Sequence, residues 1–211
     1  MTATHFYEPV KGHRLPHSPL KAIVAPRPIG WISTVDTLGR VNLAPYSFFN
    51  FVCETPPILA FSSKGRKDSL RNVEATGEFV ANLATLDLAE QMNISAAEVA
   101  PGEDEMQLAG LEAAPSTLVK PPRVAASPAA LECRVISIQE LKDIRGVATD
   151  WHLVMGEIVG VHIDPRFLED GLFDTAKARV LARCGYRGYY SATEELLEIA
   201  RPAEASAVSI R

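Results

Sequence analysis

A cluster of hydroxyl, cationic and glycine residues follows one predicted strand and precedes a predicted helix. Its members are Ser62, Ser63, Gly65, Arg66, Lys67, Asp68 and Ser69. A strand end that meets a helix N-terminus offers unpaired backbone N–H groups and the positive end of the helix dipole. The serines add donors, and the cations can neutralise a dianion. We interpret this corner as a phosphate site, although an ordinary solvated charged loop has the same composition.

A second polar and aromatic group follows predicted strand 41–44, where Pro45 removes a backbone donor and favours a sheet edge. Its members are Asn42, Ala44, Tyr46, Ser47, Phe48 and Asn50. Amides, hydroxyls and aromatic rings in this order could form a wall for a planar ring whose N–H and C=O groups need partners. The alternative is that Phe48, Phe49 and Phe51 are core residues. A phosphate corner beside a ring wall matches the shape of flavin mononucleotide (FMN).

The apolar pattern predicts strands joined by tight turns and short helices. Strands are expected at 29–35, 41–44, 58–61, 78–83, 131–141 and 152–163, and short helices at 68–75, 87–95 and 103–108. Asp68 is the expected N-cap of the first helix, and Gly77 its stop. The chain shows no regular βαβ alternation. It therefore predicts a mainly β (α+β) fold, an antiparallel barrel with short flanking helices.

Composition limits the class of protein. The 211 residues, 47% apolar and 22% charged, suit one domain with its own core. The net charge of −5 argues against a nucleic-acid partner. No apolar run approaches the ~20 residues of a membrane span, and no secretory signal begins the chain. Three separated cysteines without a CxxC pair predict reduced thiols in a cytoplasm.

The expected organisation is an N-terminal arm at 1–25, a domain at 26–190 and a C-terminal tail at 191–211. Three histidines in the arm lack metal-ligand spacing, so no metal site is predicted. No GxGxxG motif follows a strand, so a dinucleotide would not be bound in the Rossmann manner. His152 precedes an apolar strand, where it could be structural or could help place a ligand near a cofactor.

Five segments in series resemble the flavin reductase-like family with an FMN-binding split barrel. They are PRPIGWIST, DTLGRVNLAPYSFFN, ETPPILAFSS, KDSLRNVEATGEFVANL and WHLVMGEIVGVHI, within residues 20 to 190. The resemblance implies a Greek-key split β-barrel and a homodimer with one FMN per subunit near the interface. It also likens segment 185–190 to the family's Gly/Tyr-rich C-terminal stretch.

The resemblance assigns site residues motif by motif. The implied ring wall is Trp31, Ser33, Thr34, Asn42, Ala44, Pro45, Ser47, Phe48 and Asn50, and the implied phosphate end is Ser62, Ser63, Arg66, Lys67, Asp68 and Ser69. His152 matches the family's usual histidine before an apolar strand and is the implied catalytic residue.

The implied activity is NADH- or NADPH-dependent flavin reduction, as in the reductase component of a two-component monooxygenase. The alternative is a flavoredoxin-like electron carrier that a partner protein reduces. A split-barrel oxidase acting on a pyridoxine-type substrate and a plain binding module are further alternatives. The sequence does not distinguish NADH from NADPH.

Overall fold

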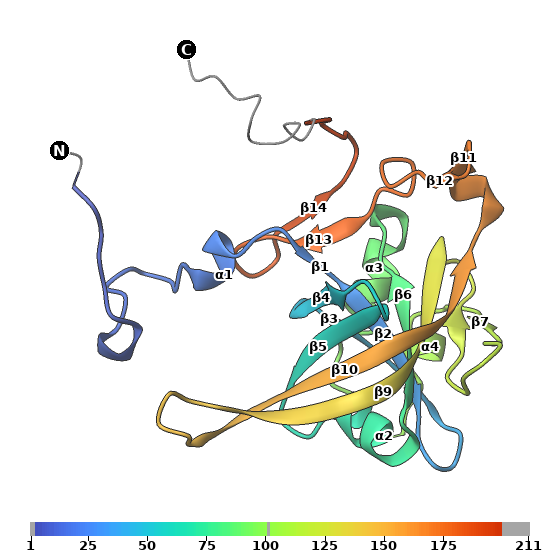
Figure 1. Cartoon of the computed structure of the whole chain (residues 1–211), viewed down its shortest axis with the longest axis horizontal. Helices are drawn as coiled ribbons and strands as arrows, with labels where there is room; N and C mark the ends of the chain where they lie inside the picture. The colour runs from blue at the N-terminus through green and yellow to red at the C-terminus, as the bar shows by residue number, and fades with distance from the viewer. Residues whose placement is uncertain (1–2, 101, 200–211) are drawn as a thin grey trace.

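The fold is a curled antiparallel sheet with short helices around it. The computed structural model describes residues 3–100 and 102–199. Its main sheet has seven strands in the order β3-β2-β6-β9-β10-β5-β4. Figure 1 shows the sheet curling, with the hairpin of β9 and β10 projecting beyond it. The strands are β2 (Gly30–Val35), β3 (Val41–Tyr46), β4 (Phe49–Cys53), β5 (Ile58–Lys64), β6 (Glu78–Leu83), β9 (Ala129–Lys142) and β10 (Ala148–Ile163).

Short strands and helices complete the structure. Three small strands, β1 (Arg27–Pro28), β13 (Leu181–Arg183) and β14 (Tyr190–Ala192), form a second sheet, and two further pairs are β7 (Ala113–Ala114) with β8 (Arg123–Val124) and β11 (Leu168–Glu169) with β12 (Leu172–Phe173). The helices are α1 (Leu20–Ile23), α2 (Asp68–Thr76), α3 (Ala89–Ile94) and α4 (Glu105–Leu108), with 3₁₀ turns η1 (Pro9–Lys11), η2 (Leu86–Leu88) and η3 (Pro165–Phe167).

The local pattern explains most of these elements. The mainly β prediction is confirmed, and the predicted 78–83 strand is β6 with the same bounds. The turn between β2 and β3 forms because Asp36 accepts the N–H groups of Leu38 and Arg40 and Gly39 supplies a φ of 81°. Pro45 is tolerated because β3 is an edge strand of the main sheet.

One predicted helix boundary needs correction. Helix α2 begins at Asp68, and its N-cap is Lys67, which is extended at φ −68° and ψ 170°. The Asp68 carboxylate, expected to cap the helix, instead pairs with Arg71 one turn later. The end of α2 is as predicted, because Gly77 takes the left-handed conformation at φ 71°.

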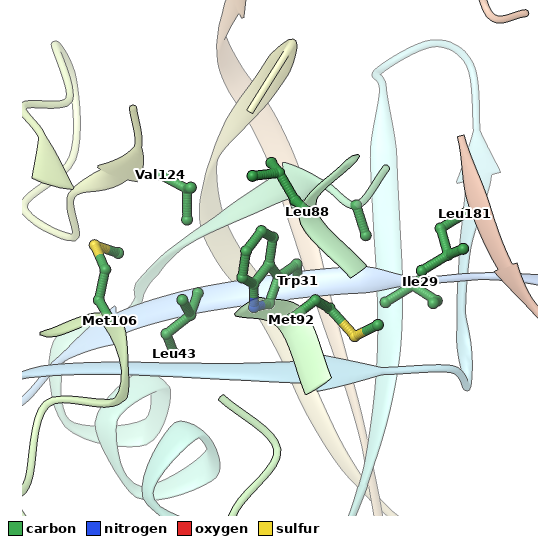
Figure 2. Packing of buried hydrophobic residues seen from close by; sticks show 9 residues of the cluster. Ile29, Trp31, Leu43, Leu88, Met92, Met106, Val124 and Leu181 are labelled. Carbon is green, nitrogen blue, oxygen red and sulfur yellow. The ribbon is translucent and has the colours of Figure 1, made fainter. Parts of the chain in front are cut away.

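Strand β2 separates two apolar cores because its side chains alternate between two faces. Trp31 on one face packs with Leu43 of β3, Met92 of α3 and Met106 of α4 (Figure 2). Ile32 on the other face packs inside the curled sheet in a cluster that also includes Phe61 of β5, Leu70 of α2 and Phe79 of β6. Each face is therefore covered by different helices, α3 and α4 on one and α2 on the other.

Two motif glycines are required by close packing rather than by unusual φ angles. A Cβ atom on Gly30 would lie 2.3 Å from Cδ2 of Phe49, and one on Gly156 would lie 2.5 Å from Cε1 of Phe79. Any larger side chain at these positions would displace an aromatic ring of the barrel wall. The glycines of PRPIGWIST and WHLVMGEI are thus explained by packing.

The N-terminal arm extends away from the curled sheet (Figure 1). Its residues 3–24 are mostly exposed, and α1 lies beside β1, β13 and β14. Part of the predicted C-terminal tail, 200–211, lies outside the described residues. The boundaries at 25 and 190 remain predictions.

A buried carboxylate fastens the long segment before β9 to the sheet. Glu132 of β9 is fully buried and accepts the backbone N–H groups of Thr117, Leu118 and Val119, at 2.7, 2.6 and 3.0 Å. His162 of β10 also contacts this carboxylate. Burial acts to raise the pKa of Glu132, but the bonds from His162 and the three amides outweigh it and hold the pKa below its ordinary value.

We predict that Glu132→Gln lowers the free energy of unfolding at pH 7 by about 1–3 kcal/mol, because an amide cannot accept all these bonds. A depressed folded-state pKa stabilises the fold above the unfolded value of about 4.3 and loses that stabilisation as the pH falls through the folded value. The deficit of the variant should therefore shrink below about pH 4. Urea unfolding at several pH values measures the free energy of unfolding of the variant and of wild type, and Glu112→Gln, a change at an exposed glutamate, is the control. Equal stability of Glu132→Gln and wild type at pH 7 would contradict the assignment.

Candidate functional site

The start of helix α2 is tied to the sheet by buried amides and hydroxyls. The side-chain nitrogen of Asn42 donates to Oγ1 of Thr34 at 3.2 Å and to Oγ of Ser69 at 2.9 Å. Nδ2 of Asn72 donates to the same Thr34 oxygen at 3.0 Å. All four side chains are buried. The network fixes the first turn of α2 against β2 and β3.

A cavity of about 330 Å³ lies against this network and brings the two predicted groups together. It is lined by Asn42, Ala44, Pro45, Tyr46, Lys67, Asp68, Ser69, Arg71, Ser95, Ala96, Ala97, Glu98, Val99 and Glu105. We call it the β3–α2 pocket. Its walls join the predicted ring wall on β3 to the predicted phosphate end at the start of α2. Its volume falls within the range of about 300–1,000 Å³ typical of small-molecule sites.

Two buried hydroxyls near this pocket have no hydrogen-bond partner among the described residues. They are Oη of Tyr46 and Oγ of Ser63. Burial raises the pKa of Tyr46, and the neighbouring hydroxyls of Ser69 and Ser63 act in the opposite direction. Buried polar groups are almost always hydrogen-bonded, so unpartnered hydroxyls at a pocket indicate groups that await a ligand or water.

The cations at the start of α2 are not equivalent. Arg66 forms an ion pair with Glu74, and Arg71 pairs with Asp68 and also donates to the backbone oxygen of Arg66 at 2.6 Å. Lys67 forms no ion pair with any residue in the described part of the chain and lines the pocket. Lys67 is therefore the cation most available to an anionic ligand.

Glu105 is a pocket residue that the sequence did not reveal. It begins α4, is buried, and accepts the backbone N–H of Leu43 at 2.9 Å. Burial raises the pKa of Glu105, the Leu43 bond lowers it, and the charges of Asp68 and Asp104 raise it further. It lies 62 residues from its partner in sequence, so no local pattern could indicate the contact. The pocket thus has a cationic and an acidic side.

Three predicted wall residues are buried and do not line the pocket. Trp31 is fully buried, and its indole N–H donates to Oγ of Ser95 at 2.9 Å. Ser33 is also fully buried and donates to the backbone oxygen of Pro122 at 2.6 Å. Both side chains lie on the β2 face that packs toward α3 and α4, and neither lines the β3–α2 pocket. Their predicted cofactor contact stays a prediction. Thr34 lies beneath the pocket, where its hydroxyl holds the amides of Asn42 and Asn72.

The remaining predicted residues lie around the pocket without lining it. Phe48 packs edge-on against Trp151, at 5.2 Å between ring centroids, and Asn50 is exposed on β4. Ser62 donates its backbone N–H to the oxygen of Phe48 at 2.8 Å, and its buried hydroxyl has no partner among the described residues. Ser47 lines a separate cavity, beside α1 and β13.

His152 lies on β10 directly opposite Ser63 of β5. It does not line the β3–α2 pocket. Its Nδ1 is buried and has no hydrogen-bond partner among the described residues, as is also true of Oγ of Ser63. Nδ1 of His152 is therefore free to hydrogen-bond a group outside residues 3–100 and 102–199. The predicted catalytic role of His152 stays a prediction.

The described residues show neither a metal cluster nor a membrane-spanning helix. No group of three or more His, Cys, Asp or Glu side chains there is placed to hold a metal ion. No described helix is long and apolar enough to cross a membrane.

Comparison with known proteins gives a consistent result. The Flavin reductase like domain family matches residues 24–181. An uncharacterized protein of Deinococcus radiodurans is 36% identical over 213 residues, covering 95% of this chain and 91% of that protein.

Two solved structures share this fold. Nitrilotriacetate monooxygenase component B from Bacillus cereus is similar at a TM-score of 0.84 and 25% identity, over 94% of this chain and 100% of that one. The 2-nitrobenzoate 2-nitroreductase of Pseudomonas fluorescens is similar at 0.77 and 26% identity, over 87% and 88%. The predicted split barrel is confirmed, and the chain belongs to the flavin reductase-like domain family.

Proposed function

We propose that this protein is an FMN-binding oxidoreductase in which NADH or NADPH reduces the flavin. One observation carries the proposal. The β3–α2 pocket joins a wall of Asn42, Ala44 and Pro45 to the cationic start of a helix at Lys67 and Ser69. A planar ring system with a phosphate at one end needs these two surfaces in one cavity.

The donor set of the pocket fits such a ligand. Tyr46, which lines the pocket, carries a buried hydroxyl without a partner in the described chain, and Lys67 carries a charge without an ion-pair partner there. A phosphate can accept bonds from a lysine, hydroxyls and N–H groups at a helix start. We assign the phosphate end to Lys67, Ser69 and the first amides of α2, with Arg66 in a lesser role because Glu74 already pairs with it.

When bound, the flavin would supply the hydride-accepting chemistry, which the protein itself lacks. The chain's own residues bind and orient it. The Thr34–Asn42–Ser69 network holds the wall rigid, and Lys67 with the start of α2 stabilises negative charge. The pocket lining also contains the carboxylates Asp68, Glu98 and Glu105, of which Asp68 is paired with Arg71. Glu98 and Glu105 disfavour an anion near them, so we expect the phosphate to lie beside Lys67.

The family relationship supports two finer assignments within the same proposal. The first is a homodimer with FMN near the interface. The second is a protein partner that receives the electrons, since the B. cereus neighbour is by name one component of a monooxygenase. An electron carrier reduced by a partner protein is the alternative function.

Anaerobic titration of the FMN-loaded protein with NADH and with NADPH tests the proposal. We expect the flavin absorbance to bleach with at least one donor. A tightly bound flavin that neither donor bleaches would overturn the reductase and favour the electron carrier.

We predict that Lys67→Ala weakens FMN binding about tenfold, which corresponds to about 1.4 kcal/mol, because a charge-assisted contact to phosphate is lost. Arg66→Ala should weaken it less, because the ion pair with Glu74 already occupies that guanidinium. Quenching of FMN fluorescence measures both dissociation constants, and Lys64→Ala, a neighbouring cation outside the pocket, is the control. Unchanged affinity in Lys67→Ala would contradict the phosphate assignment.

We predict that His152→Ala slows flavin reduction at least about tenfold while FMN affinity changes less, because a misplaced donor loses reactive geometry. Stopped-flow absorbance at saturating NADH or NADPH gives the rate, and fluorescence titration gives the affinity. His152→Gln, which keeps a polar side chain of similar reach, is the matched comparison. A normal rate in His152→Ala would show that this histidine is only structural.

A further inference from the structure

A second cavity, of about 700 Å³, lies between the N-terminal and C-terminal parts of the domain. We call it the cationic pocket. Helix α1, strand β1 and the turn between β13 and β14 lie together there (Figure 1). The side chains that give it its character are Lys21, Arg27, Arg183, Arg187, Tyr186 and Tyr189.

The charge of this pocket is one-sided. Its lining includes four Lys or Arg side chains and no carboxylate. Arg27 is 7% exposed, and its Nη1 donates to the backbone oxygens of Lys21 and Val24. Its Nε is buried without a partner among the described residues. No carboxylate neutralises the Arg27 guanidinium within this pocket, so burying its charge is costly, and an anion in the pocket would reduce that cost.

Aromatic groups give the pocket flat surfaces as well. The rings of His17 and Tyr186 lie 5.9 Å apart, and the side chain of Tyr189 is 63% exposed. Lys21 and Arg27 both lie 5.8 Å from the ring centre of Phe48. Exposed rings beside several cations suit a ligand that carries planar bases on a multiply charged backbone.

The cationic pocket and the β3–α2 pocket have lining residues that are next to each other in the chain. Tyr46 lines the β3–α2 pocket, and the next residue, Ser47, lines the cationic pocket.

We propose that the cationic pocket binds the diphosphate of the nicotinamide dinucleotide that donates the hydride. The inference rests on the proposed function, and it places the donor on Lys21, Arg27, Arg183 and Arg187 without a Rossmann motif. Four cations match the charge of a diphosphate better than that of a single carboxylate. The tyrosines offer surfaces on which a base stacks.

Calorimetric binding of NADP⁺ to the FMN-loaded protein tests the site without requiring turnover. We expect Lys21→Ala and Arg187→Ala each to weaken binding about fivefold and the double variant about 25-fold, since each removes one charge contact. Arg187→Lys should stay within about twofold, because it keeps the charge. Lys177→Ala, an exposed cation outside the pocket, is the control and should bind as wild type. Added salt and inorganic pyrophosphate should both weaken NADP⁺ binding.

The outcomes separate this inference from the reductase proposal. Wild-type protein that binds neither NAD⁺ nor NADP⁺ at low salt, or a double variant that binds the dinucleotide within twofold of wild type, would overturn the cationic pocket as the dinucleotide site. A matching loss of FMN affinity in the double variant would also overturn it, because the pocket would then hold the flavin phosphate. NADP⁺ binding that depends on these residues supports the site even if NADPH fails to bleach the flavin.

Discussion

The hydrogen bonds of Asn42 link the edge of the sheet to the first turn of α2, and the candidate site depends on them. One amide nitrogen reaches both Thr34 on β2 and Ser69 on α2. Because these groups are buried, leaving any of them unpaired would cost more than an exposed hydrogen bond is worth. The first amides of α2 and the β3 wall therefore keep a fixed relation, as a preorganised site requires.

The charged side chains around the β3–α2 pocket differ in whether the fold gives them an ion-pair partner. Arg66 and Arg71 each have an acidic partner, whereas Lys67 has none in the described chain. Glu105 adds a buried carboxylate to the lining of the same pocket. Of the two cations in the predicted phosphate corner, Arg66 and Lys67, only Lys67 lacks an ion-pair partner among the described residues. The cationic pocket differs, because no carboxylate is among its lining residues.

The long segment between α4 and β9 is held against the sheet by a buried side chain. The buried carboxylate of Glu132 accepts three consecutive amides of this segment, which would otherwise lack partners within the chain.

Much of the fold could be predicted because its signals are local. Alternating apolar residues, the turn at 36–39, the edge proline and the glycine that ends α2 each act within a few residues, and each predicted strand is present. The anion corner was likewise readable, because a strand end, a glycine and a helix start adjoin in the chain.

By itself, the sequence determined six of the seven main-sheet strands, the antiparallel class and the place where a strand end meets the start of α2, whereas it missed β4. Only the tertiary structure decided which face of β2 meets the pocket, so Trp31 and Ser33 proved to be core residues. The tertiary structure also decided that Arg66 forms an ion pair with Glu74 and that Glu105 lines the β3–α2 pocket. It also brought residues near 21–27 and 183–187 together around one cationic cavity. These outcomes depend on contacts between distant segments, which strand pairing sets and local residue patterns do not encode.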